Sequence, residues 1–373
     1  MASLRLFNLP REIILQILNR LSRCDLLSLS LVNNTTCAAT EPVLWSDIAL
    51  VCRPRHPPSI DLLLQTLFKK QHLLEYTIHL AFKSFGFAQN FHPGHIPRFP
   101  VESLPQDVAA SFIQCTTLGP ALKDTWIQEL KLATLDALVT LVVALLPNLT
   151  FLRLTHRFTP YTAILGQLLR HQLCQDQPIP HEIKLLILSK SLRQVDFLTS
   201  NQYYRNSPDI LPFLHLPSLE HISIGIANRF AFLFPVEMPS LKSLVSLKLK
   251  GIRESSLQYI LKPLENPQAL SWQFYTDGTY SPSEGFIDLE VMGAALRSIS
   301  KTVTYLNISE TDEFDDNIFD GPQLSIQSSL DGLKEFDRLK ELIIPWIFLM
   351  GFKPGRGESC YIVCLVTLHA ENE

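Results

Sequence analysis

Apolar and polar positions at the start of the chain follow a helical period. Pro10 suits a first helical turn. An arc of about 140° on one helix face is covered by Ile13, Ile14, Ile17, Leu18 and Leu21, with Leu15 outside it. Ser22 with Asp25 three positions later resembles a capping box, which predicts a second helix that runs to about Val32. Asn33 then ends that helix. The pattern predicts three short helices within residues 6–50.

The second of these helices has no polar side. Leu26, Leu27, Leu29, Leu31 and Val32 point in nearly every direction around its axis, and only small serines interrupt them. A module of about 50 residues hides only about 60% of its unfolded-chain surface, so something outside the module must cover these side chains. The covering surface could come from the rest of this chain or from another protein, and both alternatives stay open.

The same residues carry a resemblance to a known family. The series Leu9-Pro10, Glu12, Ile13-Ile14, Ile17-Leu18, Leu21, Asp25-Leu26-Leu27, Leu29, Leu31-Val32, Pro42 and Leu44-Trp45 resembles an F-box in order and nearly in spacing. The resemblance implies a three-helix module that docks on the Skp1 adaptor of SCF ubiquitin ligases. It implies that the adaptor face is formed or supported by Leu9, Pro10, Ile14, Leu26, Leu29, Val32 and Trp45.

Beyond this module, short runs of period two alternate with helical stretches at residues 60–74, 133–146 and 161–174. Each run has one apolar residue, two variable positions, and two further apolar residues one position apart, as in leucine-rich repeats. Several runs follow a Pro and a short polar residue. The predicted copies are Ile127-Leu130-Leu132, Leu149-Leu152-Leu154, Leu192-Val195-Phe197, Leu219-Ile222-Ile224, Leu244-Leu247-Leu249, Val303-Leu306-Ile308, Leu339-Leu342-Ile344 and a degenerate one with Leu270, Trp272 and Phe274.

The fold class is therefore α/β: a three-helix F-box followed by an irregular solenoid that resembles leucine-rich repeats. An ordinary alternating α/β sheet domain remains the alternative. The expected units are an F-box at 1–50, a Pro-rich linker at 51–59, a repeat domain at 60–352 and a tail at 353–373. In a solenoid, the positions between the apolar residues line one exposed sheet face and select a partner. These positions include Thr150, Arg153, Glu220, Ser223, Lys248, Gln273 and Glu341.

Charge and length exclude several classes. A net charge of -4 and a pI near 6.3 argue against a protein that binds nucleic acid through its phosphates. The two most apolar segments, 138–146 and 343–352, are far shorter than the roughly 20 residues of a membrane-spanning helix. Seven cysteines without paired spacing indicate reduced thiols, which favours the cytoplasm, the nucleus or both.

The sequence offers no recognisable catalytic, cofactor or metal motif. Nucleophile-elbow, phosphate-loop and dinucleotide fingerprints are missing, and neither His92 with His95 nor Cys360 with Cys364 has convincing ligand partners. Residues 82–105 are expected to form a long loop, and the acidic span 311–321 an exposed loop without an EF-hand spacing.

These patterns predict a protein that is not an enzyme. It is expected to bind a Skp1-like adaptor, through it a cullin, and a protein substrate of unknown identity through the repeat face. Two alternatives stay open: an F-box scaffold that acts outside the ligase, and an α/β enzyme whose helical N-terminus packs on its own body.

Overall fold

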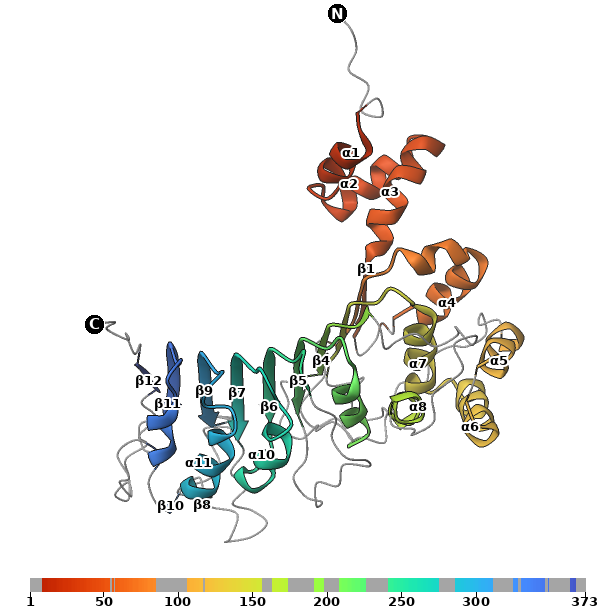
Figure 1. The fold of residues 1–373 in the computed structure, drawn as a ribbon. Helices are drawn as coiled ribbons and strands as arrows, with labels where there is room; N and C mark the ends of the chain where they lie inside the picture. The colour runs from red at the N-terminus through yellow and green to blue at the C-terminus, as the bar shows by residue number, and fades with distance from the viewer. Residues whose placement is uncertain are drawn as a thin grey trace, which may run out of the picture.

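The computed structural model describes residues 9–53, 56, 58–84, 106–116, 118–155, 163–173, 191–197, 208–225, 241–274, 286–310, 325–327, 330–345, 348 and 363–366. Three N-terminal helices project beyond one end of a long sheet, and further helices cover one face of that sheet (Figure 1). The class is α/β, as the alternation of periods predicts.

The N-terminal helices are α1 (Arg11–Leu18), α2 (Arg23–Ser30) and α3 (Asn34–Ser46), which confirms the expected three. Ser22 caps α2 as predicted: its Oγ accepts from Asp25 N at 3.2 Å and donates to Asp25 Oδ2 at 2.6 Å. Asn33 begins α3, because its side chain accepts from Thr36 N while Thr36 Oγ1 accepts from Asn33 N. Pro10, expected in the first turn of α1, is its N-cap residue.

Within the described residues, ten strands form the main sheet, and nine of them run parallel in chain order, with only β12 antiparallel at the far edge. A small parallel pair joins β8 (Phe286–Asp288) to β10 (Ser325–Gln327). The main strands are β1 (Asp47–Cys52), β2 (His79–Ser84), β3 (Phe151–Leu154), β4 (Gln194–Phe197), β5 (His221–Gly225), β6 (Ser246–Lys250), β7 (Ala269–Phe274), β9 (Tyr305–Glu310), β11 (Glu341–Pro345) and β12 (Val363–Val366).

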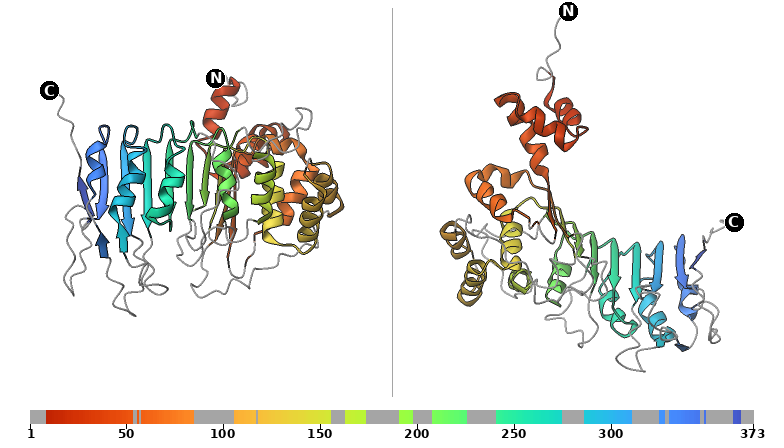
Figure 2. Two further views of the ribbon diagram at one scale, coloured as in Figure 1. Left: turned by 60° about the horizontal axis from the view of Figure 1, so that its bottom comes forward. Right: turned by 180° about the vertical axis from the view of Figure 1, so that it is seen from behind.

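Helices follow the strands and lie against one face of the sheet, as the two further views show (Figure 2). The helical stretches expected at 60–74, 133–146 and 161–174 are confirmed, the first as α4 followed by a 3-10 helix. The helices are α4 (Ile60–Lys69), η2 (Gln71–Glu75), α5 (Gln106–Gln114), α6 (Pro120–Lys131), α7 (Leu135–Leu145), α8 (Ala163–Leu173), η3 (Pro208–His215), α10 (Glu254–Leu261), α11 (Leu289–Arg297) and η5 (Asp331–Glu335).

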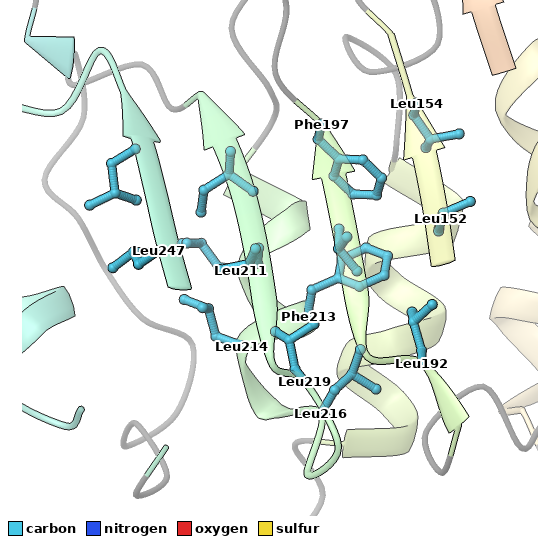
Figure 3. Packing of buried hydrophobic residues seen from close by; sticks show 14 of the residues in the cluster. Leu152, Leu154, Leu192, Phe197, Leu211, Phe213, Leu214, Leu216, Leu219 and Leu247 are labelled. Atoms are coloured by element: carbon cyan, nitrogen blue, oxygen red, sulfur yellow. The ribbon is translucent and has the colours of Figure 1, made fainter. Parts of the chain in front are cut away.

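The sheet's buried face is built from the apolar triplets. Leu152, Val195 and Ile222 stand in one register row on neighbouring strands, and this row continues from Ile48 on β1 to Leu342 on β11. All triplets predicted from Leu149 onward are buried, as is the degenerate copy on β7. Figure 3 shows these side chains pointing from the strands toward the helices, where Phe197 meets Phe213 edge-on at 5.0 Å.

The predicted copy Ile127-Leu130-Leu132 is wrong. These residues lie in or just after α6, which starts at Pro120 and buries Trp126 and Leu130, whereas Leu132 is exposed. Apolar residues three positions apart fit a helix as well as this repeat pattern, so the spacing alone could not distinguish a helix from a strand.

Strands β1 and β2 were not expected. Residues 51 and 52, assigned to the linker, belong to β1, so the strand begins inside the expected F-box segment.

The short polar residue before four of the runs has a structural role. Its side chain donates to a backbone carbonyl of the preceding turn: Asn148 to Glu75 O at 2.9 Å, Ser191 to Pro147 O at 2.9 Å, Ser218 to Leu192 O at 2.9 Å and Ser243 to Pro217 O at 2.8 Å. A backbone ladder runs beside it, from Thr150 N to Ile78 O through to Lys340 N to Thr304 O. These side-chain bonds and the backbone ladder link successive turns to one another.

Three expectations fall partly or wholly outside the described residues. Of the loop expected at 82–105, residues 82–84 belong to β2, and 85–105 are not described. The acidic span 311–321 is not described. Of the tail 353–373, only β12 is described, and it pairs with β11 as an edge strand, which was one of the two expected outcomes.

A partly buried histidine makes stability depend on pH. Burial lowers the pKa of His215 below its ordinary value, and its Nε2 has no hydrogen-bond partner among the described residues. The unfolded chain therefore binds a proton more readily, so stability is lost as pH falls below about 6.5. We expect the urea midpoint to fall more between pH 7.5 and pH 5.5 in the wild type than in His215→Leu, as followed by circular dichroism. An equal change of the urea midpoint with pH in the two proteins would contradict this role of His215.

Candidate functional site

The N-terminal helices expose a concentrated apolar surface. Leu31 is 86% exposed, Val32 65% and Leu27 50%, all within or just after α2. Ile13 and Ile17 on α1, with Leu21 after it, are also exposed. These six make up almost half of the thirteen large hydrophobic residues found exposed among the described parts of the chain, although they fall within twenty residues. A patch of this kind on a small module marks an interaction site.

The same module has little interior of its own. Among residues 9–46, only Leu18, Leu26, Thr36 and Thr40 are buried. Two of these four are threonines, and Thr40 Oγ1 satisfies its hydroxyl by donating to Thr36 O at 2.9 Å. Threonine contributes less apolar area to a core than leucine, so hydrophobic burial within the module is small. The module therefore has more to gain from covering its outer surface than from its own packing.

The predicted adaptor residues occupy different depths. Pro10 and Val32 are exposed, whereas Leu9, Ile14 and Leu29 are partly buried. The other two are not on the open surface: Leu26 is buried inside the module, and Trp45 is partly buried against the core of the sheet domain. These two can support the surface but cannot form its outer layer.

Sequence reasoning left out the most exposed members of this surface. Leu27 and Leu31 were recognised only as part of an all-apolar helix, and Ile13, Ile17 and Leu21 only as part of an apolar arc. The sequence did contain a signal for these five residues, because each lies on or next to a helix with more apolar faces than a module of this size can bury. The pattern does not show which of these helix faces packs on α3.

The module is fixed to the sheet by direct connections. Helix α3 runs into β1 without an intervening residue, and Arg23 Nη1 donates to Asp47 O at 3.0 Å. Glu41 on α3 reaches Lys70 Nζ at 3.3 Å and His72 Nε2 at 3.1 Å, both beyond α4. Partial burial acts to raise the pKa of Glu41, but the hydrogen bonds and charges of His72 and Lys70 outweigh it and leave that pKa lowered. The carboxylate form therefore fastens α3 to the sheet domain.

The sheet offers a second surface on the face away from the helices. Five of the predicted readout residues stand there on the strands: Arg153, Ser223, Lys248, Gln273 and Glu341. The remaining two, Thr150 and Glu220, precede β3 and β5 and belong to the backbone ladder at the start of the strands. The face is polar, and His79 and Arg153 both contact Phe151 on it.

Neither surface shows a cluster suited to a metal. Within the described residues, no three His, Cys, Asp or Glu side chains gather closely enough to hold an ion. None of the helices in this part of the chain has the length and apolar character that a membrane span requires.

Comparison with known proteins identifies the module. Residues 6–45 match the F-box domain, so this chain is an F-box protein. F-box domains in general bind the Skp1 adaptor of SCF-type ubiquitin ligases. A search of curated proteins gives no match to the chain.

Proposed function

We propose that this chain is a substrate-recognition subunit of an SCF-type ubiquitin ligase. In this proposal the F-box binds a Skp1-like adaptor, through which a cullin is recruited. The observation that carries the proposal is the uncovered apolar surface of α1 and α2, where Leu31 is 86% exposed. An α/β enzyme with helices packed on its own body would instead bury those side chains against the sheet domain.

The proposal treats the sheet domain as an irregular solenoid that resembles leucine-rich repeats. Three features support this interpretation: parallel strands in chain order, a buried apolar triplet at each of β3 to β7, β9 and β11, and a polar side chain that links each of four turns to the previous one. The spacing is uneven, because helices α5 to α7 stand between β2 and β3. Such a domain presents a long sheet face, which in this proposal receives the protein substrate.

Catalysis in this proposal is positional and needs no reactive group in the chain. Holding a substrate near a bound ubiquitin conjugate raises the effective concentration of its lysines. The modifying chemistry belongs to a separate enzyme. Because ligase subunits of this kind act inside the cell, the proposal places the protein in the cytoplasm, the nucleus or both.

The test is purification of the tagged full chain from cells in which the proteasome is inhibited. We expect the adaptor and a cullin among the co-purifying proteins, together with a bound partner that the assembly ubiquitinates. An adaptor without a cullin would instead favour an F-box scaffold acting outside the ligase. Failure to recover the adaptor would overturn the proposal altogether.

A further inference from the structure

Helix α1 is the least anchored of the three F-box helices. It has only eight residues, and among them only Leu18 is buried. Its N-cap residue, Pro10, makes no side-chain capping bond. Within the described part of the chain, no side chain of α1 forms a hydrogen bond or an ion pair. The attachment of α1 therefore depends on one buried leucine and on the partly buried Ile14 and Leu15.

Helices α2 and α3 are held by specific bonds. The Ser22 side chain caps α2, and Arg23 Nη1 donates to Asp47 O at 3.0 Å. Helix α3 begins with a capping box and continues directly into β1. The two helices also pack closely on each other, whereas α1 has only a small contact with α3. Unfolding of α1 alone would therefore leave the bonds of α2 and α3 in place.

The backbone hydrogen bonds of α1 are too few to keep it helical. The nucleus of a helix forms with an equilibrium constant of only about 10⁻³, and isolated helices shorter than about 12 residues are marginal in water. A helix as short as α1 must therefore be stabilised by burying an apolar face. On α1, however, Ile13 is 41% exposed and Ile17 is 37% exposed, so much of that face is still in water. Local opening should therefore need less free energy for α1 than for α2 or α3.

An adaptor on this apolar surface would supply the burial that α1 lacks. F-box domains in general bind Skp1, and Ile13 and Ile17 belong to the uncovered surface of the F-box. These two residues are four positions apart, so they share one face only when the backbone between them is helical. A partner that covers both side chains must therefore bind the folded form of α1. Part of the binding free energy then offsets the cost of ordering this helix.

We propose that α1 is folded in only a minority of free chains and that docking on a Skp1-like adaptor completes it. This inference rests on the proposed function and adds a folding step at the same site. The observed association constant is that of the folded form multiplied by the fraction of free chains in which α1 is folded. A substitution that changes only the helix propensity of α1 should therefore change the affinity for the adaptor.

The test compares two substitutions at Gln16, which is exposed on α1. Alanine and glycine both remove the polar side chain, but their helix propensities differ by ~1 kcal/mol, which corresponds to about fivefold in a folding equilibrium. We expect Gln16→Gly in the full chain to bind purified Skp1-like adaptor about fivefold more weakly than Gln16→Ala, as measured by calorimetry. The control pair, Gln128→Gly and Gln128→Ala, makes the same change at an exposed position of α6 outside the F-box and should differ by less than about twofold.

Hydrogen exchange followed by mass spectrometry measures the folding step directly. In the free chain, the amides of residues 13–18 should exchange within about threefold of the unfolded-chain rate, whereas those of residues 37–46 are protected. Bound adaptor should slow exchange at residues 13–18 by at least about tenfold. Equal adaptor affinities for the two Gln16 variants, or protection of residues 13–18 in the free chain as strong as that of residues 37–46, would each overturn this inference. If the wild type fails to bind the adaptor, the proposed function itself is contradicted.

Discussion

Leu31→Asp should abolish capture of a Skp1-like adaptor while leaving the fold intact. Leu31 is 86% exposed, so aspartate there costs the free protein little. In a complex, the same carboxylate would be buried against an apolar partner without a counter-charge, which is strongly unfavourable. We expect affinity for purified adaptor to fall by at least about 100-fold, as measured by calorimetry or surface plasmon resonance. Leu27→Asp on α2 should act in the same direction.

Leu132→Asp is the matched control for this experiment. Leu132 is 63% exposed after α6, outside the F-box, so the chemical change and its solvent setting are comparable. Adaptor affinity should remain within about twofold of the wild type, because a distant surface substitution has little effect. Full retention of binding by Leu31→Asp and Leu27→Asp would show that the adaptor does not use this surface.

Trp272→Ala should cause a large loss of stability in the sheet domain. Trp272 on β7 is fully buried, packs on Phe274 at 5.7 Å and donates from Nε1 to Ile252 O at 2.8 Å. Truncation leaves a cavity and an unpaired buried carbonyl, which together cost about 3–5 kcal/mol of unfolding free energy. Urea unfolding followed by circular dichroism measures this loss.

Tyr259→Ala is the companion substitution on the neighbouring helix. Tyr259 on α10 is 63% exposed, so its removal should change the unfolding free energy by no more than about 0.5 kcal/mol. If Trp272→Ala cost less than about 1 kcal/mol, the core described for β6 to β9 would be incorrect.

Sequence patterns predicted the strands correctly where the apolar spacing fits the two-residue period of a strand and does not also fit a helix. One example is the alternating apolar pair Ile222 and Ile224, which predicted a strand. Both lie buried in β5, and Leu219, just before that strand, is buried as well. The prediction failed at Ile127-Leu130-Leu132, where a three-residue apolar spacing also fits one helix face. It missed β1, because Asp47–Cys52 follows directly on a helix and precedes a proline-rich stretch that looks like a linker.

The candidate site was predicted less completely than the fold. The sequence shows that an apolar helix must be covered by other residues. Which of its faces packs on the neighbouring helix depends on tertiary contacts that a single sequence does not reveal. Leu26, which was expected to form or support the adaptor face, is buried and can only support it, while Leu31, the most exposed hydrophobic residue described, was left out. The pairing of Arg153 with Asp196 joins residues 43 positions apart and depends on strand register alone.

The direct passage from α3 into β1 has a geometric consequence. A flexible tether would let a docked protein sample many orientations relative to whatever holds the N-terminal helices, but here the two platforms share one continuous backbone braced at Arg23 and Glu41. If the chain acts as proposed, the distance and angle between a bound substrate and the adaptor are then properties of the fold. The substrate lysines that come within reach would be set by this rigid geometry rather than by the motion of a flexible tether.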